Sequence, residues 1–198
     1  MTLASMSLIL FLIMDPFGNI SSFIDQLKAT PKNAYKKTVL RELLFALLLM
    51  VLFAFIGEGL LQFLQLSRTT VYISSGLILF LMAFQILFPT SKSIRKNLPS
   101  TIPYVIPLAL PLIAGPSLLA TIMLFTVEHS FMFLMSGILI SWILATFVLI
   151  FSKEIQSILK ENGLVAVERL MGMILILLAI QRVAEGIILF VRGLSTQT

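Results

Sequence analysis

The chain has 198 residues, of which 59% are hydrophobic and only 12% are charged. A soluble domain carries about 25% charged residues, so this composition excludes an ordinary soluble protein and indicates an integral membrane protein. The net charge of +5 does not predict nucleic-acid binding, because the basic residues are sorted by loop and are not gathered on one surface.

Six apolar stretches are long enough to cross a bilayer core, which takes about 20 residues of helix. They leave only short connections, so the sequence predicts an all-α integral membrane protein that forms a single domain over residues 1–198. In chain order the predicted spans are residues 3–25, 38–62, 70–88, 104–126, 130–152 and 164–191.

The first predicted span is interrupted by polar and helix-breaking residues. Its stretch IMDPFGNI holds Asp15, Pro16, Gly18 and Asn19 in the middle of an apolar run. Irregular backbone is tolerated in a membrane only where it packs against protein or lines a wet cavity. Because Asp is a favoured N-cap and Pro a favoured first helical residue, we predict two half-helices, the second capped by Asp15 and starting at Pro16.

Asp15 is the strongest single indication of function. A carboxylate near the bilayer centre costs about 2.5–3.5 kcal/mol and normally faces the bundle interior or an aqueous pathway. Three roles stay open for it: binding a cation, holding a proton, or capping a helix.

The fourth predicted span contains a second break, in the stretch AGPS, residues 114–117. Gly115 is its flexible point, Pro116 is the predicted first residue of a second half-helix, and Ser117 supplies a hydroxyl. The new helix start carries a partial positive charge that suits a carboxylate.

Three prolines precede this break at a spacing of four. An interior Pro removes the hydrogen bond to the carbonyl four residues back, and a freed carbonyl is a ligand for an ammonium group or an alkali cation. A simple kink that shapes the helix is the alternative. The residues are Pro103, Pro107 and Pro111.

The two halves of the chain resemble each other. GLILFLMAFQ (76–85) matches GMILILLAIQ (172–181) at an offset of 96, and LFLIMDP (10–16) matches LPLIAGP (110–116) at an offset of 100. Three spans per half force the halves into opposite orientations, so the sequence predicts a 3+3 inverted repeat with interrupted first and fourth helices.

The predicted repeats cover about 1–88 and about 103–198, joined by a cytoplasmic linker at about 89–102. The matched residues of the third and sixth spans are candidates for packing between the repeats or for a polar lining. They are Gly76, Gln85, Gly172 and Gln181.

Basic residues predict the topology. Eleven of the fourteen Lys and Arg lie in the first, third and fifth connections, which the positive-inside rule assigns to the cytoplasm, so that both termini face outward. No Lys or Arg precedes Asp15, so a cleaved signal peptide is not expected.

Three ion pairs are predicted near the ends of helices. Arg182 and Glu185, three apart on one helical face, are predicted to pair near the outer end of the last span. Local pairs are predicted where helices enter the membrane, Arg41 with Glu42 and Glu168 with Arg169.

Several chemistries lack residues to support them. The chain has no Cys and a single His, so no metal site or thiol chemistry is expected, and His129 is interpreted as a solvated loop residue. No nucleotide, hydrolase or zinc-protease motif is present. We therefore expect neither an enzyme nor a cofactor.

The blocks that carry these predictions also carry a family resemblance. LIMDPFGNISSF, RELLFALLLM, IPLALPLIAGPSLLAT and ERLMGMILILLA together resemble the MarC family (UPF0056) of bacterial inner-membrane proteins, with most likeness to its YhgN-like branch. The resemblance extends over nearly the whole chain and implies a multi-pass inner-membrane protein. The sequence departs from the family's usual pattern at two positions. Most members carry Pro where this chain has Ser21, and many carry Gly where it has Ser117.

The family is grouped with six-span neutral amino acid transporters. The resemblance thus implies a secondary transporter of small neutral amino acids or similar zwitterions. H⁺ and Na⁺ both stay open as a coupling ion. An ion channel or ion carrier, and a membrane assembly subunit that transports nothing, are the alternatives. The expected partners are the lipid bilayer and the solute, with no nucleic acid, and a homo-oligomer stays open.

Overall fold

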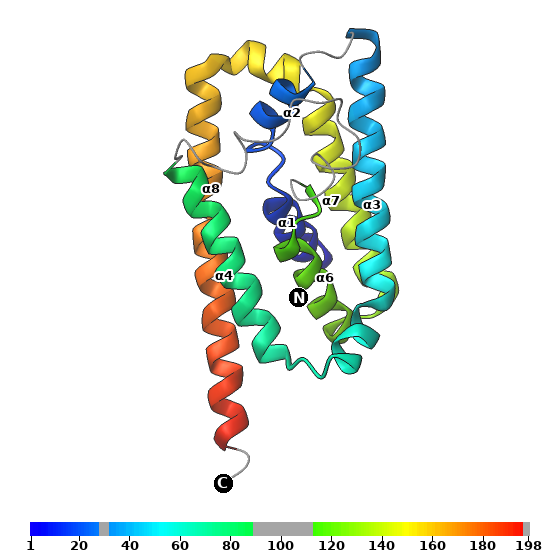
Figure 1. Ribbon diagram of the computed structural model, residues 1–198, viewed down its shortest axis with the longest axis vertical. Coiled ribbons are helices and arrows are strands. Elements are labelled where there is room, and N and C mark those ends of the chain that lie inside the picture. The colour runs from blue at the N-terminus through cyan, green and yellow to red at the C-terminus, as the bar shows by residue number, and fades with distance from the viewer. Residues whose placement is uncertain (28–31, 89–112, 196–198) are drawn as a thin grey trace.

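The computed structural model describes residues 1–27, 32–88 and 113–195, which form helices and turns without a strand (Figure 1). The helices are α1 (Leu3–Met14), α2 (Ile20–Gln26), α3 (Lys32–Phe63), α4 (Arg68–Leu87), α6 (Pro116–Glu128), α7 (Phe131–Ile150) and α8 (Ser152–Ser195).

Four segments of the described residues are helices long and apolar enough to cross a membrane. They match the second, third, fifth and sixth predicted spans to within a few residues, and the first predicted span is resolved into α1 and α2. Residues 104–112 of the fourth predicted span, with Pro107 and Pro111, lie outside the described residues, as does Pro103, so the full six-span repeat stays a prediction. The four segments are Ala34–Phe63, Arg68–Leu87, Phe131–Ile150 and Asn162–Leu194.

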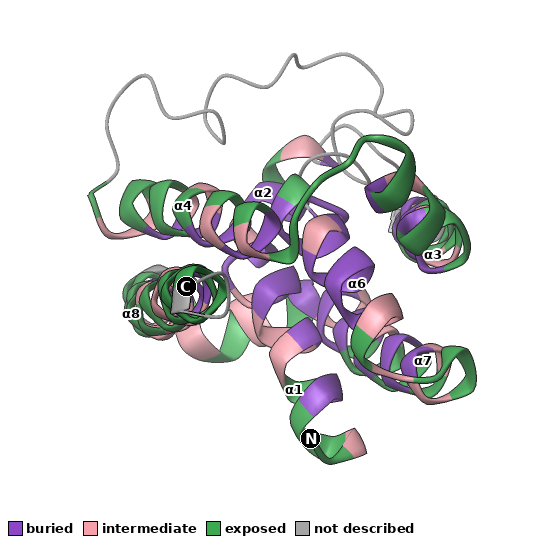
Figure 2. Ribbon diagram, turned by 90° about the horizontal axis from the view of Figure 1, so that it is seen from below, coloured by how far each residue is buried: buried purple, intermediate pink, exposed green. Residues whose placement is uncertain are grey.

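Helices α1 and α6 form the centre of the bundle. The pair α4–α8 lies on one side of them and the pair α3–α7 on the other (Figure 2). Helix α6 is buried on most of its surface, as expected for an apolar helix that packs on all sides. The outer faces instead expose large apolar residues, such as Leu48, Phe55, Phe147 and Leu177, which suits contact with lipid.

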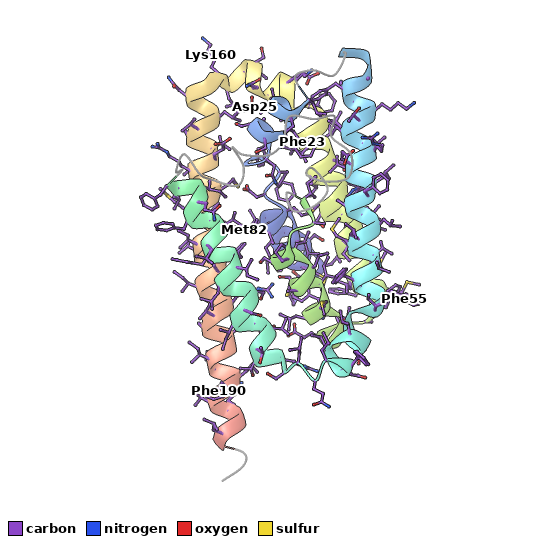
Figure 3. The ribbon with its side chains drawn as sticks, in the orientation of Figure 1. Phe23, Asp25, Phe55, Met82, Lys160 and Phe190 are labelled. Carbon is purple, nitrogen blue, oxygen red and sulfur yellow. The ribbon has the colours of Figure 1, made fainter. Side chains whose placement is uncertain are left out.

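Helix α8 contains a sharp kink at Lys160, where the backbone adopts φ 55° and ψ −177°. Residues 152–159 cross the end of the bundle before the long span runs back through it, and Lys160 lies at the corner (Figure 3). The basic connection predicted before the sixth span is therefore largely helical. This helical segment contacts the start of α3 through two polar pairs. The Tyr35 hydroxyl lies 2.7 Å from Ser152 Oγ, and the Lys36 ammonium lies 3.5 Å from the Glu154 carboxylate.

Glycines allow α4 and α8 to approach closely as antiparallel neighbours. A Cβ added at Gly76 would lie 2.8 Å from Val183 Cγ2, and one at Gly172 would lie 3.1 Å from Leu87 Cγ. The structure therefore places both predicted glycines in the contact between the third and sixth spans. Gln85 and Gln181 are exposed and line no described cavity.

We expect Gly76→Val to destabilise the α4–α8 contact. The new Cβ would lie 3.0 Å from the Ala179 carbonyl oxygen, which is backbone and cannot rotate away, so the helices must separate at a cost of about 1–3 kcal/mol. Thermal unfolding in detergent measures the effect. Gly59→Val is the matched control, because a Cβ at Gly59 meets nothing within 4 Å, and equal melting temperatures for the two variants would contradict the packing.

Candidate functional site

The first break is a self-contained polar turn between α1 and α2. Asp15 ends α1 in the left-handed conformation, at φ 46° and ψ 56°, which Asp tolerates better than most residues. Its carboxylate accepts the Gly18 N–H at 3.1 Å, and the Asn19 side-chain amide donates to the Met14 carbonyl at 3.0 Å. The turn thus satisfies backbone groups that the interrupted helix would otherwise leave open.

The prediction that Asp15 is the N-cap of a helix starting at Pro16 is wrong. Helix α2 begins at Ile20, its N-cap is Asn19, and Asp15 is the C-cap of α1. The reason is local geometry: the carboxylate binds the Gly18 N–H within the turn, and the following residues form this turn before the helix starts. Asp15 is only 3% exposed and Asn19 is fully buried.

The predicted start of the second half-helix is confirmed, whereas the segment of the span up to residue 112 lies outside the described residues. Gly115, with ψ 163°, is the N-cap of α6, and Pro116 is its first residue. No side chain of the described residues caps this helix start. Ser117 is buried and donates to the Ser75 carbonyl of α4 at 3.3 Å. A helix start without a side-chain cap keeps its N–H groups and its partial positive charge facing the break.

Both breaks lie near the middle of the bundle's height, where α1 ends and α6 begins (Figure 1). Helix α2 starts on one side of this level and α6 on the other, so the two helix starts face the centre from opposite directions. The structure thus places the end of α1, at Asp15, and the start of α6, at Gly115, at a similar level of the bundle.

A polar seam runs from the second break along the contact between α4 and α6. The Thr121 hydroxyl donates to the Ser117 carbonyl at 2.8 Å, and Ser117 donates across to α4 as described above. Near the end of α6, the Tyr72 hydroxyl donates to Glu128. Sequence reasoning missed this seam, although Ser117, Thr121 and Glu128 recur at helical spacing, because hydroxyls in a membrane helix most often bind their own backbone.

The seam ends at Arg182 of α8, where a predicted ion pair is absent. Arg182 was expected to pair with Glu185, but the described residues place no carboxylate within 4.0 Å of it, and Glu185 instead accepts from Gln181 at 2.9 Å. The guanidinium carbon lies 5.6 Å from the ring centroid of Tyr72 and 5.3 Å from that of Phe125. The long side chain packs inward on aromatic faces, which the spacing within one helix cannot predict.

Three other polar residues are more buried, or make more contacts, than the sequence indicated. Glu42 pairs with Arg41 at 2.6 Å, as predicted, but is fully buried. Glu168 accepts from Ser21 of α2, which connects α8 to the first span. The His129 ring lies 5.3 Å from Phe133 and is only partly exposed, so it is more than a solvated loop residue.

A pocket of about 400 Å³ is lined by residues of α8 alone, from Asn162 to Met173. Among the described residues no group of three His, Asp or Glu side chains is placed to hold a metal ion.

Comparison with known proteins finds similar sequences over nearly the whole length. The model of a family described as "MarC family integral membrane protein" matches residues 1–191. A UPF0056 membrane protein of Buchnera aphidicola subsp. Baizongia pistaciae is 42% identical over 188 residues, covering 92% of this chain and 94% of the relative.

Two further relatives also match over nearly their whole length. The UPF0056 inner membrane protein YhgN of Escherichia coli K12 is 41% identical over 194 residues, covering 96% of this chain and 98% of the relative. A UPF0056 membrane protein of Chlamydia pneumoniae is 29% identical over 188 residues, 93% of each chain. No solved structure matches the chain.

Proposed function

The chain belongs to the MarC family of integral membrane proteins, and from this premise we propose that it is a secondary transporter of small neutral amino acids. In this proposal the solute crosses the bacterial inner membrane by alternating access between two inverted halves. The observation that carries the proposal is the pair of helix breaks that meet at mid-height, each with buried polar groups. Transporters of this architecture bind their solutes at such discontinuous helices.

Reciprocal packing supports the inverted repeat. Gly76 of α4 packs on Val183 of α8, and Gly172 of α8 packs on Leu87 of α4. Adding 96 to one residue of each pair and subtracting it from the other converts the first contact into the second. Two contacts that are exchanged in this way are expected when two halves are related by a two-fold axis.

The same exchange relates whole helices. Helix α7, from the fifth predicted span, packs on α1 of the first, and α3 of the second packs on α6 of the fourth. The pairs α4–α8 and α3–α7 are each converted into themselves. This pattern supports halves that can rock against each other around a central site.

We assign the charges of the solute to opposite parts of this site. The start of α6 lacks a side-chain cap within the described residues and suits the carboxylate. The buried Asp15 carboxylate suits the ammonium group, or a coupling H⁺ or Na⁺. Pro107 and Pro111 belong to the same proposal, through the carbonyls they would free.

Flux in proteoliposomes tests the function. Uptake and efflux of labelled glycine, alanine and serine are measured with Na⁺, proton or no gradient, and compared with empty vesicles. We expect saturable amino-acid flux that Gly115→Leu abolishes, because a large side chain would fill the break. Ion flux without amino-acid counterflow would instead favour an ion channel or carrier, and no flux under any gradient would remove the amino-acid assignment.

Cysteine accessibility distinguishes a transporter from a non-transporting assembly subunit. Ser117→Cys introduces the sole thiol of the chain at a site that is 2% exposed. We expect a small water-soluble thiol reagent to label it over minutes, because alternating access hydrates the break, and a transported amino acid to slow the labelling. Ser141→Cys is the matched control, fully buried on α7 and expected to stay unlabelled. Equal protection at both positions would contradict a hydrated site.

A further inference from the structure

Arg182 is a buried cation held between three helices. Its side chain on α8 is 6% exposed, and its guanidinium lies against the rings of Tyr72 on α4 and Phe125 on α6. Ring faces attract a guanidinium by roughly 0.5–2 kcal/mol. They do not supply the in-plane acceptors that its N–H groups prefer.

The positive charge of Arg182 has no ion-pair partner among the described residues. No carboxylate oxygen there lies within 4.0 Å, and the Nη1 atom is buried without a hydrogen-bond partner. A buried guanidinium without a direct ion-pair partner is costly to keep. Burial of this kind points to a partner that is bound only part of the time.

Two carboxylates are close enough to attract this guanidinium electrostatically, and each accepts a hydrogen bond from another side chain. Glu128 accepts the Tyr72 hydroxyl, and Glu185 accepts the Gln181 amide. Neither acid forms an ion pair with Arg182 within 4.0 Å, yet their charges remain close by. Such a set favours a zwitterion over a solute with net negative charge, because the ammonium of a zwitterion can face the acids.

We propose that Arg182 binds the carboxylate of a small zwitterionic amino acid, at the end of the bundle where α6 turns into α7. The proposal rests on the transport function proposed above and adds a second binding position to it. A planar guanidinium binds a carboxylate through two parallel hydrogen bonds, which suits the free Nη1 edge.

This position is distinct from the breaks. Phe125 lies eight residues after Ser117 on α6, about 12 Å along the helix axis. Ser117 and Tyr72 place polar contacts between α4 and α6 at both ends of this distance.

Thermal stabilisation of the detergent-purified protein tests the proposal directly. L-Alanine and acetate are titrated as carboxylates, alaninamide and sodium chloride as probes that lack one, all at equal ionic strength. We expect both carboxylates to raise the melting temperature, with alanine effective at lower concentration. The apparent Kd for alanine should rise on the order of tenfold or more in Arg182→Gln, through loss of a charge-assisted pair. Arg68→Gln is the matched control, exposed at the start of α4 and expected to behave as the wild type.

Each result decides the proposal. Absence of carboxylate-specific stabilisation in the wild type, or a Kd within twofold of it in Arg182→Gln, would overturn it. If Arg182→Gln does not fold, Tyr72→Phe decides: loss of the hydroxyl frees Glu128 to pair with Arg182, so the Kd should rise severalfold, and an unchanged Kd would overturn the site.

The flux assay separates this proposal from the transport function. Arg182-dependent stabilisation without amino-acid flux would leave the carboxylate site standing and remove the transporter. Amino-acid flux in Arg182→Gln with an unchanged KM would leave the transporter standing and remove the site.

Discussion

Gly18→Ala is expected to lower the free energy of unfolding by roughly 2–4 kcal/mol. A Cβ at Gly18 would lie 2.2 Å from Asp15 Oδ2 and 2.7 Å from its Cγ, so the carboxylate must move and its bond from the Gly18 N–H is lost. The side chain of Asp15 is short and buried, which leaves it little room to move. The cost is therefore larger than that of an ordinary overpacked methyl group.

Thermal unfolding followed by the fluorescence of Trp142, the single tryptophan, measures this effect. The Trp142 Nε1–H donates to the Leu43 carbonyl at 2.8 Å and so reports on the α3–α7 contact. Gly59→Ala is the control, with open space around the new methyl and an expected gain of up to about 1 kcal/mol. A melting temperature for Gly18→Ala close to that of this control would show that the carboxylate is not held against Gly18.

Asp15→Asn is expected to abolish most transport while leaving the fold intact. The Asn side chain keeps an oxygen that can accept the Gly18 N–H, so the turn survives, but the negative charge is gone. Loss of one partner of a buried charge pair costs about 2 kcal/mol or more, which corresponds to about a 30-fold or greater fall in flux. Asp15→Ala should lose both flux and stability, since it also removes the acceptor.

The comparison with Asp25→Asn isolates the effect of the charge. Asp25 lies on α2, ten residues further along, and is exposed, so the same substitution there should leave the flux unchanged (Figure 3). Flux in Asp15→Asn equal to that of Asp25→Asn would mean that Asp15 serves only to close the turn. The hydrogen bond to Gly18 would then be its whole role.

The flux and binding assays together would order the two positions along one path. If Arg182 and the breaks both bind the solute, Arg182→Gln should weaken binding from the side of the α6–α7 turn, whereas Asp15→Asn should reduce flux from either side. The reason is position: the Arg182 guanidinium lies against Tyr72 and Phe125, near the end of α6, and Asp15 lies at the end of α1.

Much of the local structure could be predicted from the sequence. The four long spans follow from apolar length alone, and Pro116 after Gly115 predicts the start of α6 correctly because both residues act through their own backbone. The break at Asp15 was also located correctly. Its internal geometry was not, since a carboxylate can bind an N–H either in a following helix or in a turn, and sequence spacing does not separate the two.

Contacts between helices were predictable only in part. The recurrence of Gly76 as Gly172 indicated a packing role, and both glycines do lie in the α4–α8 contact. The spacing of residues did not predict three other features, which depend on the packing of helices far apart in the sequence. They are the burial of Glu42, the hydrogen bond from Ser21 to Glu168, and the kink at Lys160.

A membrane-embedded helical chain with two polar interruptions could be read from the residues alone, because hydropathy, proline and glycine act over a few neighbouring residues. The packing of Arg182 on Tyr72 and Phe125, away from Glu185, depends instead on the arrangement of three helices. A long charged side chain reaches partners on other helices, and its position follows from burial and ring geometry across the bundle. This position leaves a buried cation without a direct ion-pair partner among the described residues, beside the proposed path.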